Sequence, residues 1–266
     1  MRPCPNCRCT DYKLCYTESP FQVIKCKKCK LVFLGNPLDE NTLYENYHET
    51  TELDFDEYSP ASNSKHIAGL FAINRQRLKW ILRTGKSGKL LDVGCGRGYF
   101  LKTMSDAGYD VAGMDVSMTA IEYVRKQFAL QASNTTLDEL VRGGEKYDVI
   151  TMWHVLEHFI DPYDALNKIR QLLNDDGACF IEVPNLRSLK FLLAKQKWQG
   201  GNHPKYHRTF FSNRTLRAAL LKAGFTKSQR VPISYRLPEG SGIFGLIKPG
   251  LNLMGMDSFL DFVVST

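Results

Sequence analysis

Four cysteines near the start of the chain have the spacing of a metal site. Cys4 and Cys7 form one C-x2-C pair, Cys26 and Cys29 form a second, and 18 residues separate the two pairs. Each C-x2-C turn brings two thiolates to one ion, and two such turns complete the tetrahedron that Zn²⁺ prefers. We therefore expect a structural zinc ribbon over residues 1–36, with four thiolates and no open coordination position for catalysis. The alternative is a set of reduced thiols in a disordered segment.

A glycine-rich loop has the setting of a nucleoside site. The loop, Gly94-Cys-Gly-Arg-Gly98, follows an apolar run and precedes a helical pattern that starts at Tyr99. Open α/β sheets bind ligands at such turns, where glycines let a ligand approach the backbone. Asp115 ends the next predicted strand, where a carboxylate can accept hydrogen bonds from both ribose hydroxyls. Tyr99 stands where dinucleotide-binding loops have Gly or Ala, so we expect a nucleoside without a pyrophosphate.

Histidines gather in two short segments that could carry out acid–base chemistry. His154 and His158 lie four residues apart, and they would share one face if that segment were helical. His203 and His207 lie in a second segment, 200–210. An oxygen or carbon acceptor of a transferred group usually has to lose a proton, and histidine can take a proton near neutral pH.

The elements that would position these residues alternate between strand and helix. This alternation predicts an α/β fold with a doubly wound, mostly parallel, Rossmann-like sheet, preceded by the small zinc-binding module. We expect the sheet domain over 66–266, after an acidic, tyrosine-rich linker or active-site flap over 37–65. The predicted strands are Lys89–Val93, Val111–Met114, Tyr147–Val155, Cys179–Val183 (after a turn at Asn174–Gly177) and Thr226–Ile233. The predicted helices are His66–Arg83, Tyr99–Ala107, Met118–Ala129, Pro162–Leu173 and Asn213–Ala223.

Composition limits the classes of function. The chain has 266 residues, 43% hydrophobic content and a net charge of +7. It lacks a run of 18 apolar residues and a secretion signal, so we expect no membrane span and a cytoplasmic protein. It also lacks a dense basic tract, so we expect no nucleic-acid partner. The tail 240–266 is apolar in patches and could finish the sheet, line an acceptor site or form a dimer contact; the oligomeric state stays open.

Residues 89–183 resemble a class I S-adenosylmethionine-dependent methyltransferase. Together with the cysteine pairs, the whole chain resembles bacterial zinc-ribbon methyltransferases, which include sugar C-methyltransferases. The resemblance implies methyl transfer from S-adenosylmethionine to a small polar metabolite, with a nucleotide-linked sugar as one candidate. The segments that carry it are Leu90–Gly98, Gly113–Ser117, Tyr147–His158, Ile181–Asn185 and Ala223–Phe225.

The resemblance also implies roles for single residues. His207 precedes Phe211-Ser212 as a histidine does in such families, and this position implies a general base. The alternative is a loop histidine that fixes its segment through a backbone hydrogen bond. His154 is a second candidate catalytic residue, since it would face the sulfonium with Trp153. The implied donor contacts are Gly94, Cys95 and Gly96 for the methionine part, Asp115 for the ribose, Val116 and Leu137 for the adenine, and Trp153.

Two alternatives come from other classes of protein. An RNA methyltransferase could use the zinc ribbon to grip RNA, but the chain lacks an Asn/Asp-Pro-Pro-aromatic motif, a Pro-Cys nucleophile and a basic patch interleaved with aromatics. A non-catalytic donor-binding protein would not need the several histidines. Within the glycine loop, Cys95 is expected to be a small packing residue rather than a nucleophile. Asp92 is expected to hold the loop by hydrogen bonds.

Overall fold

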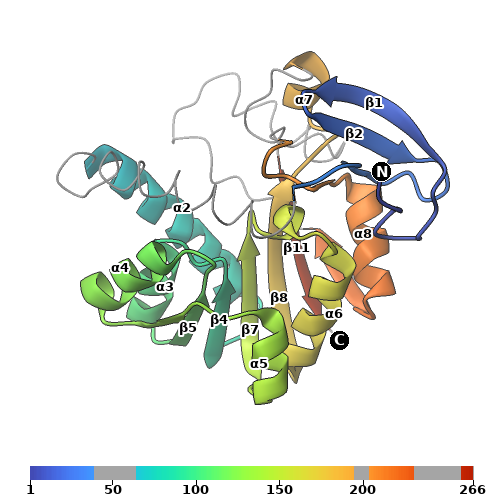
Figure 1. Cartoon of the computed structure of the whole chain (residues 1–266). Helices are drawn as coiled ribbons and strands as arrows, with labels where there is room; N and C mark the ends of the chain where they lie inside the picture. The colour runs from blue at the N-terminus through green and yellow to red at the C-terminus, as the bar shows by residue number, and fades with distance from the viewer. Residues whose placement is uncertain (39–63, 195–203, 231–258, 266) are drawn as a thin grey trace. The chain divides into compact units, whose positions relative to one another are not determined.

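The computed structural model describes residues 1–38, 64–194, 204–230 and 259–265 (Figure 1). Most of the predicted linker or flap over 37–65, together with His203 and most of the tail 240–266, lies outside the described residues. The chain divides into two compact units. The first unit comprises Met1–Leu38, Trp153–Arg170 and Ile181–Thr266, and the second comprises Asp39–Met152 and Gln171–Phe180.

A seven-stranded sheet has the order β10-β11-β8-β7-β4-β5-β6. The β4–β5, β4–β7 and β5–β6 pairs are parallel, whereas β10 and β11 are antiparallel. Strands β4 and β7 are buried almost throughout, as in a sheet covered on both faces. The predicted α/β, mostly parallel fold class is therefore confirmed. The strands are β4 (Lys89–Val93), β5 (Asp110–Met114), β6 (Gln131–Ser133), β7 (Tyr147–Trp153), β8 (Leu173–Pro184), β10 (Lys227–Arg230) and β11 (Phe259–Ser265).

Most predicted helices lie within two residues of their expected bounds, because their ends carry local signals. Ser117 caps the start of α4 by accepting a hydrogen bond from the backbone of Ala120. Ser212 and Thr215 form a capping box at the start of α8. The described helices are α2 (Ser64–Arg83), α3 (Tyr99–Asp106), α4 (Met118–Phe128), α5 (Leu137–Gly143), the 3-10 helix η1 (Leu156–His158), α6 (Pro162–Leu172), α7 (Leu189–Ala194) and α8 (Asn213–Lys222).

Two parts of the sheet differ from the sequence prediction or extend it. The turn predicted at Asn174–Gly177 is wrong, because these residues continue β8. The Asn174 amide donates a 2.7 Å hydrogen bond to Asp148 of β7, so its polar side chain is satisfied within the strand. β11 comes from the tail and lies between β10 and β8, so this part of the tail completes the sheet.

A second, four-stranded sheet contains the segment between the cysteine pairs. Its order is β1-β2-β3-β9, where β1 is Tyr12–Glu18, β2 is Phe21–Cys26, β3 is Val32–Leu34 and β9 is Thr209–Phe210. β9 pairs antiparallel with β3, with Val32 opposite Phe210 and Phe33 opposite Thr209. Val23, Val32, Leu34 and Phe210 form its buried core. Residues 1–36, which we call the cysteine segment, and the residues that follow His207 therefore contribute strands to one sheet.

None of the described helices combines the length and the apolar character needed to cross a bilayer.

Candidate active site

The glycine loop wraps over the end of β5 in the second unit. Its glycines Gly94, Gly96 and Gly98 have φ values of +71°, +52° and +71°. The backbone N–H groups of Gly94 and Cys95 both donate to the carbonyl of Met114, at 2.8 and 3.0 Å. Since these φ values lie in the left-handed region, the path of the loop favours glycine at each of the three positions.

Two of these glycines are needed for different reasons. A Cβ on Gly98 would lie 2.7 Å from a methyl carbon of Val124, so Gly98 lets α4 pack closely against the loop. A Cβ on Gly96 would meet nothing within 4 Å. Gly96 therefore borders open space, which is where a ligand can approach the backbone.

Asp115 is held by the backbone at the end of β5. Its carboxylate accepts hydrogen bonds from the N–H of Gly96 at 2.8 Å and of Ser117 at 2.9 Å. The side-chain amide of Asn134 donates to the carbonyls of Asp115 and Val116, at 3.0 and 2.8 Å. Asp115, Val116 and the glycine loop, which the sequence analysis singled out together, are thus brought together.

Cys95, within the loop, and Asp92, on β4 just before it, are both buried. Cys95 packs closely against Gly113, since a Cβ there would lie 2.8 Å from its Sγ. Burial, followed by the charges of Asp92 and Asp115, raises the pKa of the Cys95 thiol, so it stays protonated at neutral pH. Asp92 accepts a 2.6 Å hydrogen bond from Thr151, which links β4 to β7. Burial raises the pKa of Asp92 to about 7, against the smaller opposing effects of Thr151 and Arg77.

Two more predicted donor contacts are buried residues at element boundaries. Leu137 is the first residue of α5 and is 4% exposed. Trp153 is the last residue of β7 and is 9% exposed. Leu137 and Trp153 therefore pack mostly against other residues of the protein. Their contacts with the methyl donor stay predictions.

His154 directly follows β7 in the first unit and lies between two buried carboxylates. Its Nε2 lies 2.7 Å from Oε1 of Glu182, and its Nδ1 lies 3.5 Å from Oε1 of Glu157. Its backbone N–H also donates to the carbonyl of Glu182, at 2.9 Å. His154 has a φ of +61°, and its ring packs edge-on against Phe259 of β11, with 4.8 Å between centroids. A positive φ is rare for a residue with a side chain, and this one turns the chain sharply at the end of β7.

The two carboxylates determine the charge on His154. Burial alone lowers the pKa of His154, but Glu182 and Glu157 outweigh it and raise the pKa above its ordinary value. Burial raises the pKa of Glu157, but its contact with His154 and the charges of His158 and His207 lower it overall. The pKa of His158 is lowered by burial, against the opposing charge of Glu157. This arrangement favours the protonated form of His154, an ionised Glu157 and a neutral His158.

Glu157, His158 and His207 form a compact cluster, which we call the histidine cluster. One ligand atom of each residue lies within 4.8 Å of the others, a spacing at which the three could bind one cation. The rings of His158 and His207 pack edge-to-face, with 4.9 Å between centroids. His154 and His158 do not share a helical face, because only Leu156–His158 form a short 3-10 turn.

Sequence reasoning found the histidines but missed Glu182. A single acidic residue within the apolar strand segment Phe180–Val183 was the available signal, because a buried charge needs a partner. Among the described histidines, His154, His158 and His207 come together in the first unit, while the glycine loop and Asp115 come together in the second.

The four predicted cysteines converge in two matching turns. Sγ of Cys4 lies 3.5 Å from that of Cys29, the same distance separates Cys7 and Cys26, and all four lie within 4.8 Å. The residue after each pair, Arg8 or Lys30, has a positive φ and donates its N–H to the carbonyl of the first cysteine. Cys9 instead contacts the backbone of Asp11, and Cys15 is exposed on β1.

Comparison with protein families identifies the chain. Residues 65–229 match the family model described as "Methyltransferase domain". The chain belongs to this methyltransferase family. The fold agrees: the structure of magnesium protoporphyrin IX methyltransferase from Synechocystis PCC 6803, with bound SAH, superposes with a TM-score of 0.58 at 14% identity. The match covers 86% of this chain and all of that one.

Curated relatives match over a shorter part of the methyltransferase. The ubiquinone biosynthesis O-methyltransferase of Actinobacillus pleuropneumoniae serotype 5b (strain L20) is 36% identical over 112 residues, which cover 38% of this chain and 47% of that protein. The enzyme with the same name from Coxiella burnetii (strain Dugway 5J108-111) is 29% identical over 156 residues, which cover 56% of this chain and 65% of the relative. The chain thus spans between about half and two thirds of the length of these relatives.

Proposed function

We propose that this methyltransferase moves a methyl group from S-adenosylmethionine to a hydroxyl oxygen or an acidic carbon of a small polar metabolite. The observation that carries the proposal is the loop around Gly96, with its open face and the carboxylate of Asp115 held beside it. The names of the relatives, O-methyltransferases of ubiquinone biosynthesis, support a small-molecule acceptor. A nucleotide-linked sugar stays within the proposed class of acceptor.

The donor site is proposed to use the shape of the glycine loop. The backbone N–H groups of Gly94 and Cys95 both donate to the carbonyl of Met114, so the start of the loop is tied to the end of β5. Asp115 would accept hydrogen bonds from the ribose hydroxyls, and Val116 would pack on the adenine. S-adenosylmethionine, when bound, supplies a methyl group already activated by the sulfonium. Orientation is therefore much of what the protein has to add.

The histidine cluster is proposed to remove the acceptor's proton. His207 would take that proton, so that the acceptor atom could receive the methyl group that S-adenosylmethionine supplies when bound. Glu157, ionised and 1% exposed, would stabilise the positive charge that His207 acquires. This assignment keeps His207 as the general base and gives His154 the role of holding Glu157 and Glu182.

Donor binding is the first test, by calorimetric titration with S-adenosylmethionine and S-adenosylhomocysteine. Gly96→Ala would place a methyl group in the open space beside the loop, so we expect binding to be lost. Gly108→Ala is the matched control, because Gly108 also has a positive φ, +90°, and open space around it, but lies at the end of α3. Equal binding by both variants would mean that the open face of Gly96 is not the donor site.

Asp115→Ala sharpens the same test. The loss of hydrogen bonds from ribose to a carboxylate costs on the order of 3 kcal/mol, about a hundredfold in affinity. Wild-type protein that binds neither ligand would contradict the proposed function. If wild type binds, acceptors with phenolic and sugar hydroxyls can be screened by release of S-adenosylhomocysteine. We expect His207→Ala to lose turnover but keep donor binding.

The four-thiol cluster is proposed to hold a structural Zn²⁺. A tetrahedron with Zn–S bonds of about 2.3 Å has sulfur atoms roughly 3.8 Å apart, close to the spacing in this cluster. The donation from the N–H of Cys29 to Sγ of Cys26, at 3.4 Å, supports a thiolate there. Metal analysis of the purified protein should find one zinc ion per chain.

A further inference from the structure

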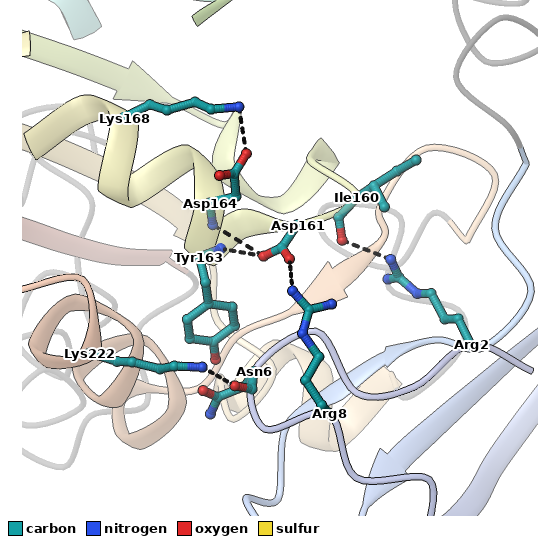
Figure 2. A network of polar contacts seen from close by, with 9 residues as sticks. All are labelled: Arg2, Asn6, Arg8, Ile160, Asp161, Tyr163, Asp164, Lys168 and Lys222. Carbon is teal, nitrogen blue, oxygen red and sulfur yellow. Dashed lines mark hydrogen bonds and ion pairs between the residues drawn. The ribbon is translucent and has the colours of Figure 1, made fainter. Parts of the chain in front are cut away.

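One arginine outside the histidine cluster holds the backbone on both sides of it. The guanidinium of Arg2 donates from Nη1 to the carbonyl of Ile160 at 2.7 Å and from Nη2 to that of Arg208 at 3.1 Å. Its Nε donates to the carbonyl of Leu34, at 2.9 Å. Figure 2 shows the contact between Arg2 and Ile160, with Arg8 and Asp161 in the same view. Three separate segments of the first unit thus meet at one side chain.

The accepting carbonyls lie next to the cluster in the sequence. Ile160 is two residues after His158, and Arg208 directly follows His207. The backbone of Arg208 completes the connection, because its N–H donates to the carbonyl of Glu157 at 2.8 Å and its carbonyl accepts from the N–H of Leu34 at 3.0 Å. Any displacement of Arg2 therefore acts on both histidine-bearing segments.

The neighbouring contact of Arg8 is of another kind. Arg8 reaches the Asp161 carboxylate at 2.7 Å, but the Arg8 side chain is 69% exposed. Asp161 also accepts hydrogen bonds from the backbone of Tyr163 and Asp164 at the start of α6 (Figure 2). An exposed ion pair contributes at most about 1 kcal/mol, and Asp161 keeps its other bonds without it. Arg8 therefore belongs to the same surface but does not bridge the two histidine segments.

We propose that Arg2 is a positioning residue, which ties the segments carrying His158 and His207 together and to the cysteine segment. The inference rests on the proposed function only in the claim that this positioning serves turnover. Arginine suits this role because its planar guanidinium carries five N–H donors in a fixed fork and can bond three carbonyls at once. Lysine has one nitrogen on a flexible stem and cannot span the same three acceptors. The cysteine segment is, on this view, part of the catalytic framework.

The state of His158 gives a direct spectroscopic readout. Its Nδ1 lies 3.1 Å from the carbonyl of Tyr206, which can only accept, so neutral His158 carries its proton on Nδ1. Tyr206 belongs to the same segment as His207 and Arg208. If Arg2 no longer holds that segment, the bond to Tyr206 loosens and the Nδ1–H tautomer is no longer required.

The experiment compares the full-length wild type with Arg2→Ala, Arg2→Lys and Arg8→Ala. Nitrogen-15 NMR of the histidine rings reports the tautomer of His158, assigned with a His158→Asn variant. We expect Arg2→Ala to lose the Nδ1–H signature and to shift the ring signals of His207, and Arg2→Lys to restore them only in part. Arg8→Ala should leave both rings as in the wild type.

Global unfolding is separated from this effect by thermal melting and by donor titration. We expect Arg2→Ala to melt cooperatively and to bind S-adenosylmethionine as tightly as the wild type. If it unfolds, Arg2→Lys, which keeps the charge and the stem, becomes the deciding variant. Wild-type ring signals in a folded Arg2 variant would overturn the proposal. Failure of the proposed function would appear differently, as absence of donor binding in the wild type itself.

Discussion

The glycine loop and the histidine cluster are built on different scales. The hydrogen bond between Gly96 and Asp115 joins residues 19 positions apart. Along the chain, the loop follows β4 and precedes β5, which pair in parallel. The histidine cluster depends on Arg2, whose acceptors Ile160 and Arg208 lie much further along the chain, at separations of 158 and 206 residues. The glycine loop is therefore determined by one short stretch of sequence, whereas the histidine cluster depends on contacts between distant parts of the chain. They should respond differently when single residues are changed.

The largest expected effect is on the cysteine segment. Cys7→Ser should abolish zinc binding and unfold the segment, because binding of structural zinc supplies on the order of 10 kcal/mol to such small modules. The histidine ring signals should change with it, whereas donor binding at the glycine loop should persist. Metal content, NMR and calorimetry on one sample measure all three. Cys15→Ser, which removes an exposed thiol outside the cluster, is the control; identical zinc content in both variants would contradict the site.

The next effect concerns the buried carboxyl below the glycine loop. The folded pKa of Asp92, about 7, lies above its ordinary value of 3.8, so the folded state binds the proton more tightly than the unfolded state does. Stability from this group is present at low pH and falls as pH rises from about 4 to about 7. The total is on the order of 4 kcal/mol.

Asp92→Asn should remove this dependence while keeping an acceptor for Thr151. Urea unfolding from pH 5 to pH 8 should show wild type losing about 3 kcal/mol relative to the variant. Asp106→Asn, at an exposed acid in α3, should follow the wild-type curve. Parallel curves for wild type and Asp92→Asn would show that Asp92 has an ordinary pKa in the folded protein.

A smaller loss of stability is expected when either of two glycines of the second unit is replaced by alanine, and comparing the two separates a packing collision from backbone strain. Gly98→Ala meets both a φ of +71° and a methyl carbon of Val124 at 2.7 Å, so we expect a loss of about 2 to 3 kcal/mol. Gly108→Ala has the strain without the collision, so about 1 kcal/mol is expected. Denaturant midpoints measure the difference, and equal losses would mean that α4 moves away at little cost.

The smallest effect is expected at the surface of α3. Lys102 and Asp106 form an exposed ion pair one helical turn apart. Asp106→Asn should reduce the free energy of unfolding by less than about 0.5 kcal/mol, and the loss should shrink in high salt. A larger, salt-independent loss would show that Asp106 has a structural role beyond this pair.

Much of the fold could be predicted because its signals are local. The glycine loop, the Ser212 cap and the C-x2-C turns each use residues a few positions apart, and the structure keeps all of them. The turn predicted at Asn174–Gly177 failed for the opposite reason, since Asp148 on a neighbouring strand satisfies Asn174 and lets the strand continue. The local composition favoured a turn, but a contact outside the window determined the result.

The sequence by itself determined the methyltransferase family, the alternation of strands and helices in the main sheet, the four thiols, the glycine loop and Asp115 at the end of the next strand. Each of these follows from residue types at short, fixed spacings, which constrain the backbone wherever they occur. The tertiary structure alone decided that Glu182 partners His154, that β9 joins β3, and that Arg2 holds the segments of His158 and His207. Those contacts join residues far apart in the chain. They form on folding because polar groups that become buried need hydrogen-bond partners.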